Sequence, residues 1–430
     1  MKLIGLTIYL VSSALFLSCN ALSNAEDSFE NITTPEELLG LNPIPESARN
    51  YLKNNSRSLD LSPDFSLIDS DLSGKQIILS GENHGISKMI KMDINLIKYL
   101  QQQKGLRHYI YELDYLTCKK ISEYLATGDE ACLTAAFSSI PGCGLMFVSE
   151  KYQTFLDLYE FNLTLPAGDR IDVIGIDTNK ETFARYTEEI KNILSSATAP
   201  AEIEDTVTML INLPLTSDWN SLYLLRKNLL KAKMDINDKK SIYTSFLGGN
   251  SLSELRLIIN EQIGAIDYSD TNIPGIIREQ YRENMLYENT LILLEKYPTD
   301  VFYGQWGAAH VRRSQCAGIH WFAELLDKSE SSPVKGKVLS IFYMAENCFG
   351  LNSNLEAVPV SNYSTHTSML SSIASELNSQ TTAFRLTGTD SPFTKDLYLM
   401  DPEANAGGVT TDYIQYLFLF KNSGATTRFR

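Results

Sequence analysis

Five apolar, strand-like runs in this 430-residue chain each lead into a carboxylate or a histidine. Segments with helical spacing of apolar residues separate them, such as the one from Ile86 to Leu100. This alternation predicts an α/β fold with a mostly parallel central sheet flanked by helices. The runs are Gln76–Gly81 before Glu82 and His84, Tyr109–Tyr111 before Glu112 and Asp114, Ile171–Ile176 before Asp177, Val301–Trp306 before His310, and Val338–Met344 before Glu346.

Parallel strands place their carboxyl ends along one edge of the sheet, and ligands bind at that edge. We therefore expect these polar side chains, which lie far apart in the sequence, to meet in one cleft. Histidines gathered with several carboxylates are typical of acid–base or metal chemistry rather than of fold maintenance. The pattern favours a hydrolase.

The composition is that of a globular protein with a core, because 43% of the residues are hydrophobic and 21% are charged. Residues 33–430 are expected to form one α/β domain. Within it, residues from about 180 to 298 show no strand pattern and are predicted to be a helical insertion that covers the carboxyl-terminal edge of the sheet. The expected helices are Glu181–Ser195, Ile203–Ile211, Trp219–Met234, Leu252–Gln262 and Ile276–Lys296.

The formal net charge is -15, and the sequence has no basic stripe with interleaved aromatic residues. Binding to nucleic acid needs a basic face for the phosphates, so the composition excludes that class of partner. The expected partner is instead a small molecule.

The N-terminus has the pattern of a secretory signal: one lysine, an apolar run from Leu3 to Leu17, and a small residue before Cys19. Residues 15–19 resemble a bacterial lipobox, in which Cys19 becomes the lipidated first residue. Residues 1–19 are thus expected to be a lipoprotein signal peptide, and the polar residues 20–32 a flexible tether. The lipid on Cys19 would be the only membrane contact, and it would hold the domain in the cell envelope, at the outer membrane or facing the periplasm. An ordinary signal peptide with a chance cysteine is the alternative.

The strongest local motif is the Gly-Glu-Asn-His-Gly segment at residues 81–85. Its glycines permit a tight loop and the close approach of a ligand to the backbone. His84 is the candidate general base that takes a proton from the attacking water. Glu82 would orient this imidazole or bind a metal. A helix entry with a solvated glutamate is the alternative.

A second histidine, His310, follows the small residues Gly307, Ala308 and Ala309 at another strand end. It would serve as a metal ligand, as the acid for the leaving group, or as an electrophile on the developing oxyanion. The alternative is a buried histidine with a backbone partner. Arg312 follows closely and is a candidate for binding an anionic group.

The carboxylates at the strand ends also need partners. Glu112 ends an aromatic-rich strand, and a carboxylate is costly to bury unpaired, so it is expected to face a histidine, an arginine or an ion. Asp114 is a candidate helix cap. Asp177 is either a cap or a substrate-binding residue. No serine elbow, phosphate loop or dinucleotide fingerprint is present, so a serine nucleophile is not expected.

Taken together, these motifs resemble the erythromycin esterase family and its superfamily, which also holds Tiki-type metalloproteases and ChaN-like haem-binding lipoproteins. That pattern runs from a strand followed by Gly-Glu-x-x-His-Gly, through a strand-end Glu and a Gly-x-Asp strand end, to a helix with Arg-(Asp/Glu)-x-x-Met-Ala-x-Asn and a strand ending in small-x-His-Val. The matching residues are the segment 81–85, Glu112, Gly175-Ile176-Asp177, Arg282-Glu283-Asn284-Met285-Leu286-Tyr287-Glu288-Asn289 and Ala308-Ala309-His310-Val311.

The resemblance implies roles for five residues. The first histidine, His84, would be the general base, the glutamates would position water or an ion, the arginine would steady the site, and the second histidine would assist at the carbonyl. The first loop is one residue shorter than in the esterases and is closer to the ChaN-like branch, which leaves a metal site open. The implied catalytic residues are His84, Glu82, Glu112, Arg282 and His310.

The leading interpretation is a hydrolase that cleaves an ester or lactone bond with histidine-activated water and requires no cofactor. The first alternative is a metal-dependent peptidase with Zn or Mn, because nitrogen and oxygen ligands suit these ions. The second is a non-enzymatic surface lipoprotein that binds haem or iron. The candidate metal ligands are Glu82, His84, Glu112 and His310.

Overall fold

The computed structural model describes residues 44–60, 62–138, 145–178, 183–195, 198–215, 219–352, 354–360, 365–398 and 407–429. The predicted signal peptide, the tether and Cys19 lie outside these residues. Among the helices of the described ranges, none is both long and apolar enough to cross a membrane.

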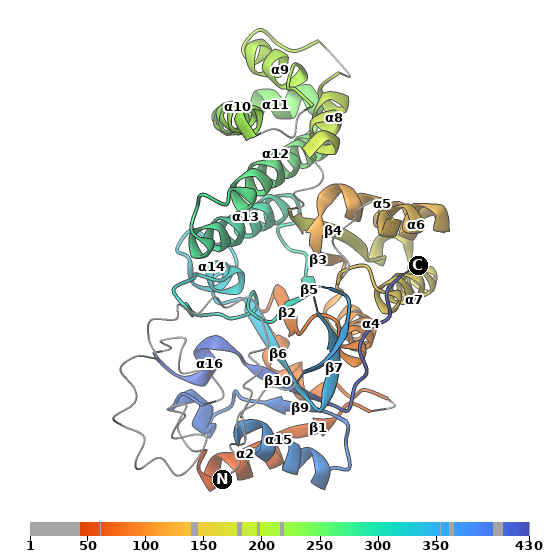
Figure 1. Ribbon diagram of the computed structural model, residues 1–430, viewed down its shortest axis with the longest axis vertical. Coiled ribbons are helices and arrows are strands. Elements are labelled where there is room, and N and C mark those ends of the chain that lie inside the picture. Colours follow the sequence, from red (N-terminus) through yellow and green to blue (C-terminus); the bar gives the residue numbers. More distant parts are fainter. Residues whose placement is uncertain are drawn as a thin grey trace, which may run out of the picture.

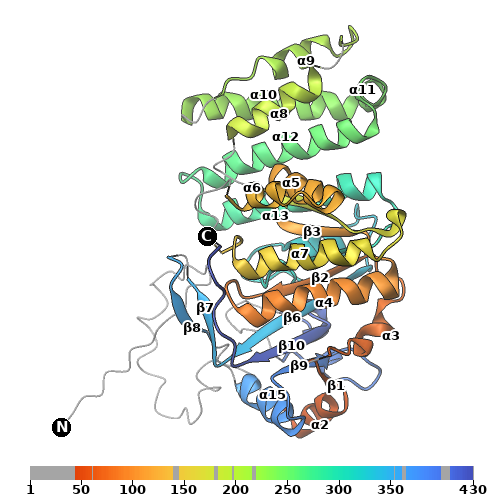
Figure 2. The same ribbon diagram turned by 90° about the vertical axis from the view of Figure 1, so that its right-hand side faces the viewer.

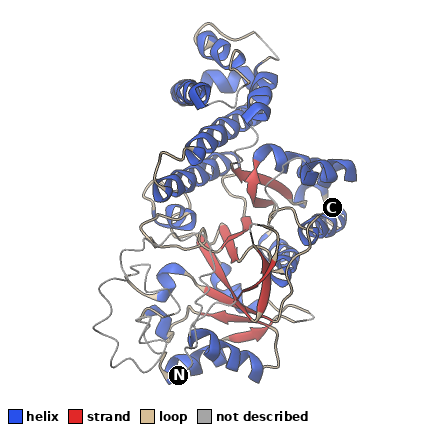
Figure 3. Cartoon of the chain, in the orientation of Figure 1, coloured by secondary structure: helices blue, strands red, loops and turns tan. Residues whose placement is uncertain are grey.

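The core of the fold is a sheet with the order β1-β9-β10-β6-β2-β5-β3-β4. All neighbours from β10 to β4 are parallel, and β1 and β9 add an antiparallel edge. This confirms the mostly parallel sheet flanked by helices (Figure 3). The strands are β1 (Ser56–Ser58), β2 (Ile77–Glu82), β3 (His108–Asp114), β4 (Asp172–Asp177), β5 (Phe302–Gly307), β6 (Val338–Glu346), β9 (Thr381–Arg385) and β10 (Tyr416–Lys421).

Helices cover both faces of the sheet, so every residue of β2, β3 and β5 is buried. One face packs against α4 (Ser87–Lys104), α5 (Tyr115–Thr127), α6 (Glu130–Ser138) and α7 (Ser149–Leu163). The other packs against α13 (Gly275–Lys296) and α14 (Phe322–Lys328). The remaining short helices are α2 (Glu46–Asn54), α3 (Asp69–Leu72), α15 (Thr365–Glu376) and α16 (Thr410–Tyr413).

Local sequence explains how strands pass into helices at the carboxyl edge. Asp114 ends β3 and caps α5, since its carboxylate accepts a hydrogen bond from the backbone N–H of Thr117 at 3.0 Å. The predicted helix cap at Asp114 is therefore confirmed. After β6, a hairpin of β7 (Cys348–Leu351) and β8 (Ala357–Val360) lies against the loop that carries His84, where the Leu351 N–H donates to the Gly85 carbonyl at 3.3 Å.

The stretch predicted to be helical contains no strand in its described residues, and it has its own apolar core. Its last helix, α13, packs on a face of the sheet, whereas α8 to α11 stack beyond α12 and away from the sheet (Figures 1 and 2). Both α13 and α12 reach the strand ends, since Glu261 of α12 accepts from the Tyr115 N–H at 2.9 Å and from Thr178 Oγ1 at 2.8 Å. The helices are α8 (Phe183–Leu194), α9 (Glu204–Ile211), α10 (Trp219–Asp238), α11 (Lys240–Leu247), α12 (Gly249–Ser269) and α13.

Candidate active site

Four adjacent strands, in the order β2-β5-β3-β4, carry polar groups at their carboxyl ends. Glu82, Glu112 and Asp177 are the closing residues of β2, β3 and β4 or lie close to their ends, and Gly307 closes β5. The parallel register of these strands brings residues as far apart in sequence as Glu82 and Gly307 into one cluster, as the edge rule predicts. Glu346, which closes β6, is not part of it, because its carboxylate accepts from Ser371 and pairs with Lys421.

His84 lies in the loop after β2 and keeps a solvent-facing side. Its Nδ1 is 2.6 Å from Glu82 Oε1, and its Nε2 is 4.0 Å from Glu112 Oε1. The side chain is 31% exposed, whereas that of Glu82 is 4% exposed. Glu82 therefore fixes one ring nitrogen, and the other lies on the side of Glu112.

Glycines make room for this imidazole. Gly85 has a φ of +84°, and a Cβ there would lie 2.4 Å from Leu351 N, so this turn requires glycine. A Cβ on Gly307 would lie 3.2 Å from His84 Nε2 and 3.4 Å from His310 Cδ2. The two histidines thus flank Gly307, whose N–H donates to Glu112 Oε2 at 2.7 Å.

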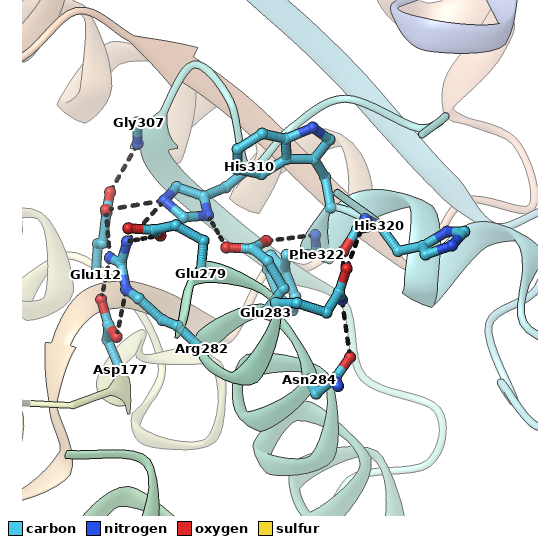
Figure 4. A network of polar contacts seen from close by, with 12 residues as sticks. Glu112, Asp177, Glu279, Arg282, Glu283, Asn284, Gly307, His310, His320 and Phe322 are labelled. Carbon is cyan, nitrogen blue, oxygen red and sulfur yellow. Dashed lines mark hydrogen bonds and ion pairs between the residues drawn. The ribbon is translucent and has the colours of Figure 1, made fainter. Parts of the chain in front are cut away.

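Arg282, on α13, binds the carboxylates of two strands at once (Figure 4). Its Nε and Nη2 donate to Asp177 at 3.0 and 2.5 Å, and Nη2 also donates to Glu112 Oε1 at 2.9 Å. Its Nη1 contacts His310 Nε2 at 3.1 Å. The guanidinium is the hub that holds α13 against the sheet edge, and Asp177 is one of its two carboxylate partners.

Sequence reasoning assigned no role to Glu283, although it is the main partner of His310. Its Oε1 is 2.7 Å from His310 Nδ1, and its Oε2 accepts from the Phe322 N–H at 2.6 Å. The side chain is fully buried. The acidic position after arginine in the helical motif was the available signal, but nothing local links it to a histidine 27 positions later in the chain.

The ionisable groups of the cluster shift one another's pKa values strongly. Burial opposes protonation of His84, yet the carboxylates of Glu82 and Glu112 outweigh it and raise its pKa to about 9. Burial and the Arg282 charge act against protonation of His310, but Glu283 and Glu112 raise its pKa to about 10. Burial would raise the pKa of Glu112, and the two histidines with Arg282 instead hold it well below its usual range.

Arg312 lies outside this network. Its Nη1 donates to Cys316 Sγ at 2.8 Å, and its guanidinium carbon is 6.0 Å from the centre of the Phe342 ring. The structure therefore brings together His84, Glu82, Glu112, Asp177, Arg282 and His310, and it leaves Arg312 beside them on partners of its own.

The donor set does not fit a divalent metal. Within the described ranges, no group of three or more His, Cys, Asp or Glu side chains is arranged to hold an ion. The Arg282 guanidinium lies among Glu112, Asp177 and His310, where it already supplies the positive charge that an ion would bring. The ring nitrogens of His310 face Arg282 and Glu283.

No protein-family model matches the chain, and no curated protein matches it. Several solved structures match the chain. A Bacillus cereus protein from a structural genomics programme matches with a TM-score of 0.66 and 14% identity over 90% of this chain and 100% of its own. An erythromycin esterase, EreC, as a variant in its open conformation, matches with a TM-score of 0.65 and 13% identity over 86% of this chain and 98% of its own.

A succinoglycan biosynthesis protein matches with a TM-score of 0.62 and 13% identity over 89% of this chain and 98% of its own. At such identities the likeness shows the fold alone. The fold that the motif resemblance implied, that of the erythromycin esterase superfamily, is therefore supported at the level of architecture, and the chemistry has to be argued from the side chains.

Proposed function

We propose that this protein is a hydrolase that cleaves an ester or lactone bond with water activated by His84. The observation that carries the proposal is the pair of His84 and Glu82: one ring nitrogen is held at 2.6 Å by a buried carboxylate, and the ring is 31% exposed. A base must meet its water, and among the polar groups of the cluster His84 is the most exposed.

The proposed reaction has two proton steps. His84 Nε2 takes a proton from water while the water oxygen bonds to the carbonyl carbon, and the carbonyl oxygen becomes an oxyanion. When the tetrahedral species collapses, the C–O bond to the alcohol breaks, and protonated His84 gives its proton to the leaving oxygen. The products are a carboxylic acid and an alcohol, or a hydroxy acid from a lactone.

The positive groups opposite His84 suit the oxyanion. The raised pKa of His310, about 10, keeps this imidazole charged at neutral pH, and Arg282 adds a second fixed positive charge beside it. Preorganised charge in a site that excludes most water is commonly the largest contribution to acyl transfer. The match to an erythromycin esterase fold supports this reading and leaves the substrate open.

Metal-dependent peptide cleavage is the weaker interpretation, because Arg282 already neutralises Glu112 and Asp177. No specific observation in the described residues favours haem or iron binding. Both readings make distinct predictions in the experiment below.

The test is mass spectrometry of the purified protein incubated with a panel of esters, macrolactones and peptides, with and without chelator. We expect chelator-resistant addition of one water to an ester or lactone, and a loss of about 10²–10⁴ in rate per folded molecule in His84→Ala. The melting temperature of this variant should also fall, because the buried Glu82 carboxylate loses its partner. His320→Ala is the matched control, because His320 is 51% exposed and contacts Glu324 outside the cluster. Chelator-sensitive peptide cleavage, or full activity in His84→Ala, would refute the mechanism.

A further inference from the structure

A cavity of about 370 Å³ lies in the helical insertion at the start of α13. It opens between α10, α12 and the loop that joins α12 to α13, which are stacked at this place (Figure 1). Small-molecule sites in proteins commonly measure about 300–1,000 Å³, so its size suits one ring of a ligand. Its lining residues are Tyr223, Arg226, Ile266, Asp267, Asp270, Asn272, Ile273 and Tyr281.

The helices that line this cavity also carry residues in or beside the candidate active site. Tyr281 in its wall directly precedes Arg282, and Asp267 directly precedes Tyr268. The Tyr268 ring centre is 5.9 Å from the Arg282 guanidinium carbon, and its hydroxyl donates to Glu279 at 2.9 Å. Neighbouring positions on α12 and on α13 therefore contribute to the cavity and to the surroundings of Arg282.

The cavity wall offers flat apolar surfaces. Tyr223 is 73% exposed and Tyr281 is 39% exposed, although large aromatic side chains are usually covered in a folded domain. Ile266 and Ile273 complete the apolar part of the lining. Exposed tyrosine rings beside a cavity supply stacking area and a hydroxyl at low entropic cost.

The polar groups of the wall are already paired with one another. Arg226 Nη2 donates to Asp267 Oδ2 at 2.9 Å, and the Asn272 side-chain amide donates to Asp270 Oδ1 at 2.9 Å. The wall thus holds one guanidinium, one amide and two carboxylates, which donate and accept hydrogen bonds in the same small space. With two carboxylates against one guanidinium, the wall carries an excess of negative charge, which disfavours an anion.

We propose that this cavity binds a neutral sugar ring, the alcohol part of an acylated sugar whose ester is presented to His84. A pyranose has an apolar C–H face that stacks on tyrosine and a rim of hydroxyls that donate and accept. The inference rests on the proposed function for the ester, but the binding of the sugar does not depend on hydrolysis.

The binding test is saturation-transfer NMR on the whole protein with the methyl pyranosides of glucose, galactose and mannose as probes. We expect transfer to at least one of them, with the C–H face most strongly saturated. Tyr281→Ala should weaken that binding about threefold to tenfold, whereas Tyr281→Phe keeps the stacking ring and most of the affinity. Met234→Ala is the control, because Met234 is 67% exposed on α10 and does not line the cavity.

A parallel assay separates this proposal from the proposed function. The preference, in kcat/KM, for an acetylated methyl pyranoside over ethyl acetate should fall in Tyr281→Ala and in Asp270→Ala. Transfer to none of the three sugars, or transfer unchanged in both variants, would overturn the sugar site. Binding that follows these variants without hydrolysis of any ester would retain the sugar site and reject the hydrolase.

Discussion

Two groups of buried charges lie on the same strands, and they are built differently. Below the strand ends, between the sheet and α4 and α7, Lys151 Nζ contacts Asp93 at 2.5 Å and both Tyr109 and Gln305 at 2.9 Å. Asp93 also accepts from the Tyr303 hydroxyl at 2.8 Å. One cation meets one carboxylate there, neutral groups satisfy the rest, and the ion pair is almost fully buried.

In the cluster at the strand ends, by comparison, the carboxylates outnumber the positively charged and ionisable basic groups. Four carboxylates, those of Glu82, Glu112, Asp177 and Glu283, surround Arg282 and two histidines. Glu82 Oε2 is buried and accepts no hydrogen bond within the described ranges. The pKa values of both histidines are raised, and His84 reaches solvent. Buried charge alone therefore does not mark a site; an excess of ionisable groups with one exposed member does.

The largest expected effect comes from the hub of the strand-end cluster. Arg282→Met leaves Glu112 and Asp177 buried without their cation, so it should cost about 3–5 kcal/mol of folding free energy. Turnover per folded molecule should also fall by about 10³, since a fixed positive charge beside the oxyanion is lost. Urea denaturation and ester assays measure the two effects. A variant with normal turnover would show that the arginine is only structural.

The buried group around Lys151 and Asp93, called the internal network from here on, should separate the loss of stability from the loss of turnover. Lys151→Met leaves Asp93 buried without its cation and should also cost about 3–5 kcal/mol of folding free energy. Turnover per folded molecule should stay within about twofold, because none of these groups reaches the cleft. The double variant Lys151→Met with Asp93→Asn should recover part of the stability. A collapse of turnover in folded protein would mean that the two clusters act together.

The pH dependence of stability follows from the raised pKa values of the histidines. Their folded values, about 9 for His84 and about 10 for His310, lie above the unfolded value of about 6.5. The stability that they contribute is complete below about pH 6.5 and is lost as pH rises through these folded values. Urea midpoints should therefore fall between about pH 6.5 and 10, and less so in His310→Gln. Equal slopes in the two proteins would contradict this electrostatic assignment.

The smallest expected effect tests how complete the internal network is. Tyr303→Phe removes one donor to Asp93 and the hydroxyl that contacts Ser80 at 2.8 Å. We expect a cost of about 1–3 kcal/mol of folding free energy, with unchanged turnover. Ser80→Ala should cost less, because Tyr303 retains its bond to Asp93. Differential scanning calorimetry at one fixed pH measures the difference in stability between Tyr303→Phe and Ser80→Ala.

The sequence predicted the strand ends well, because a parallel sheet puts its carboxyl termini on one edge whatever the loops do. Glu82, His84 and Glu112 follow from that rule. Arg282 was found through the motif resemblance and not from strand spacing, since it lies on a helix of the insertion. Glu346 shows where the rule fails: β6 lies beyond β2, away from β3 and β4, and the end of β6 contacts α15.

Other features had no local signal. In the sequence, Glu283 resembles any acidic residue of an amphipathic helix. Its contact with His310 depends on how α13 packs against the sheet. Lys151 carries no sequence signal of burial, yet its side chain is buried and contacts Tyr109 of β3 and Gln305 of β5. The sugar-sized cavity depends on how three helices stack, and the sequence specifies each helix but not their mutual placement.

The central claim is that the ionisation of His84 controls turnover. With a pKa of about 9, only about one His84 in a hundred is neutral at pH 7, so the base form should limit the rate there. The decisive measurement follows the His84 ring by NMR and kcat/KM for the best ester over one pH series. We predict that kcat/KM rises about tenfold per pH unit and levels off at the NMR pKa of His84, and that Glu82→Gln lowers both midpoints together. A flat profile between about pH 6 and 10, or a midpoint that ignores Glu82→Gln, would contradict the account.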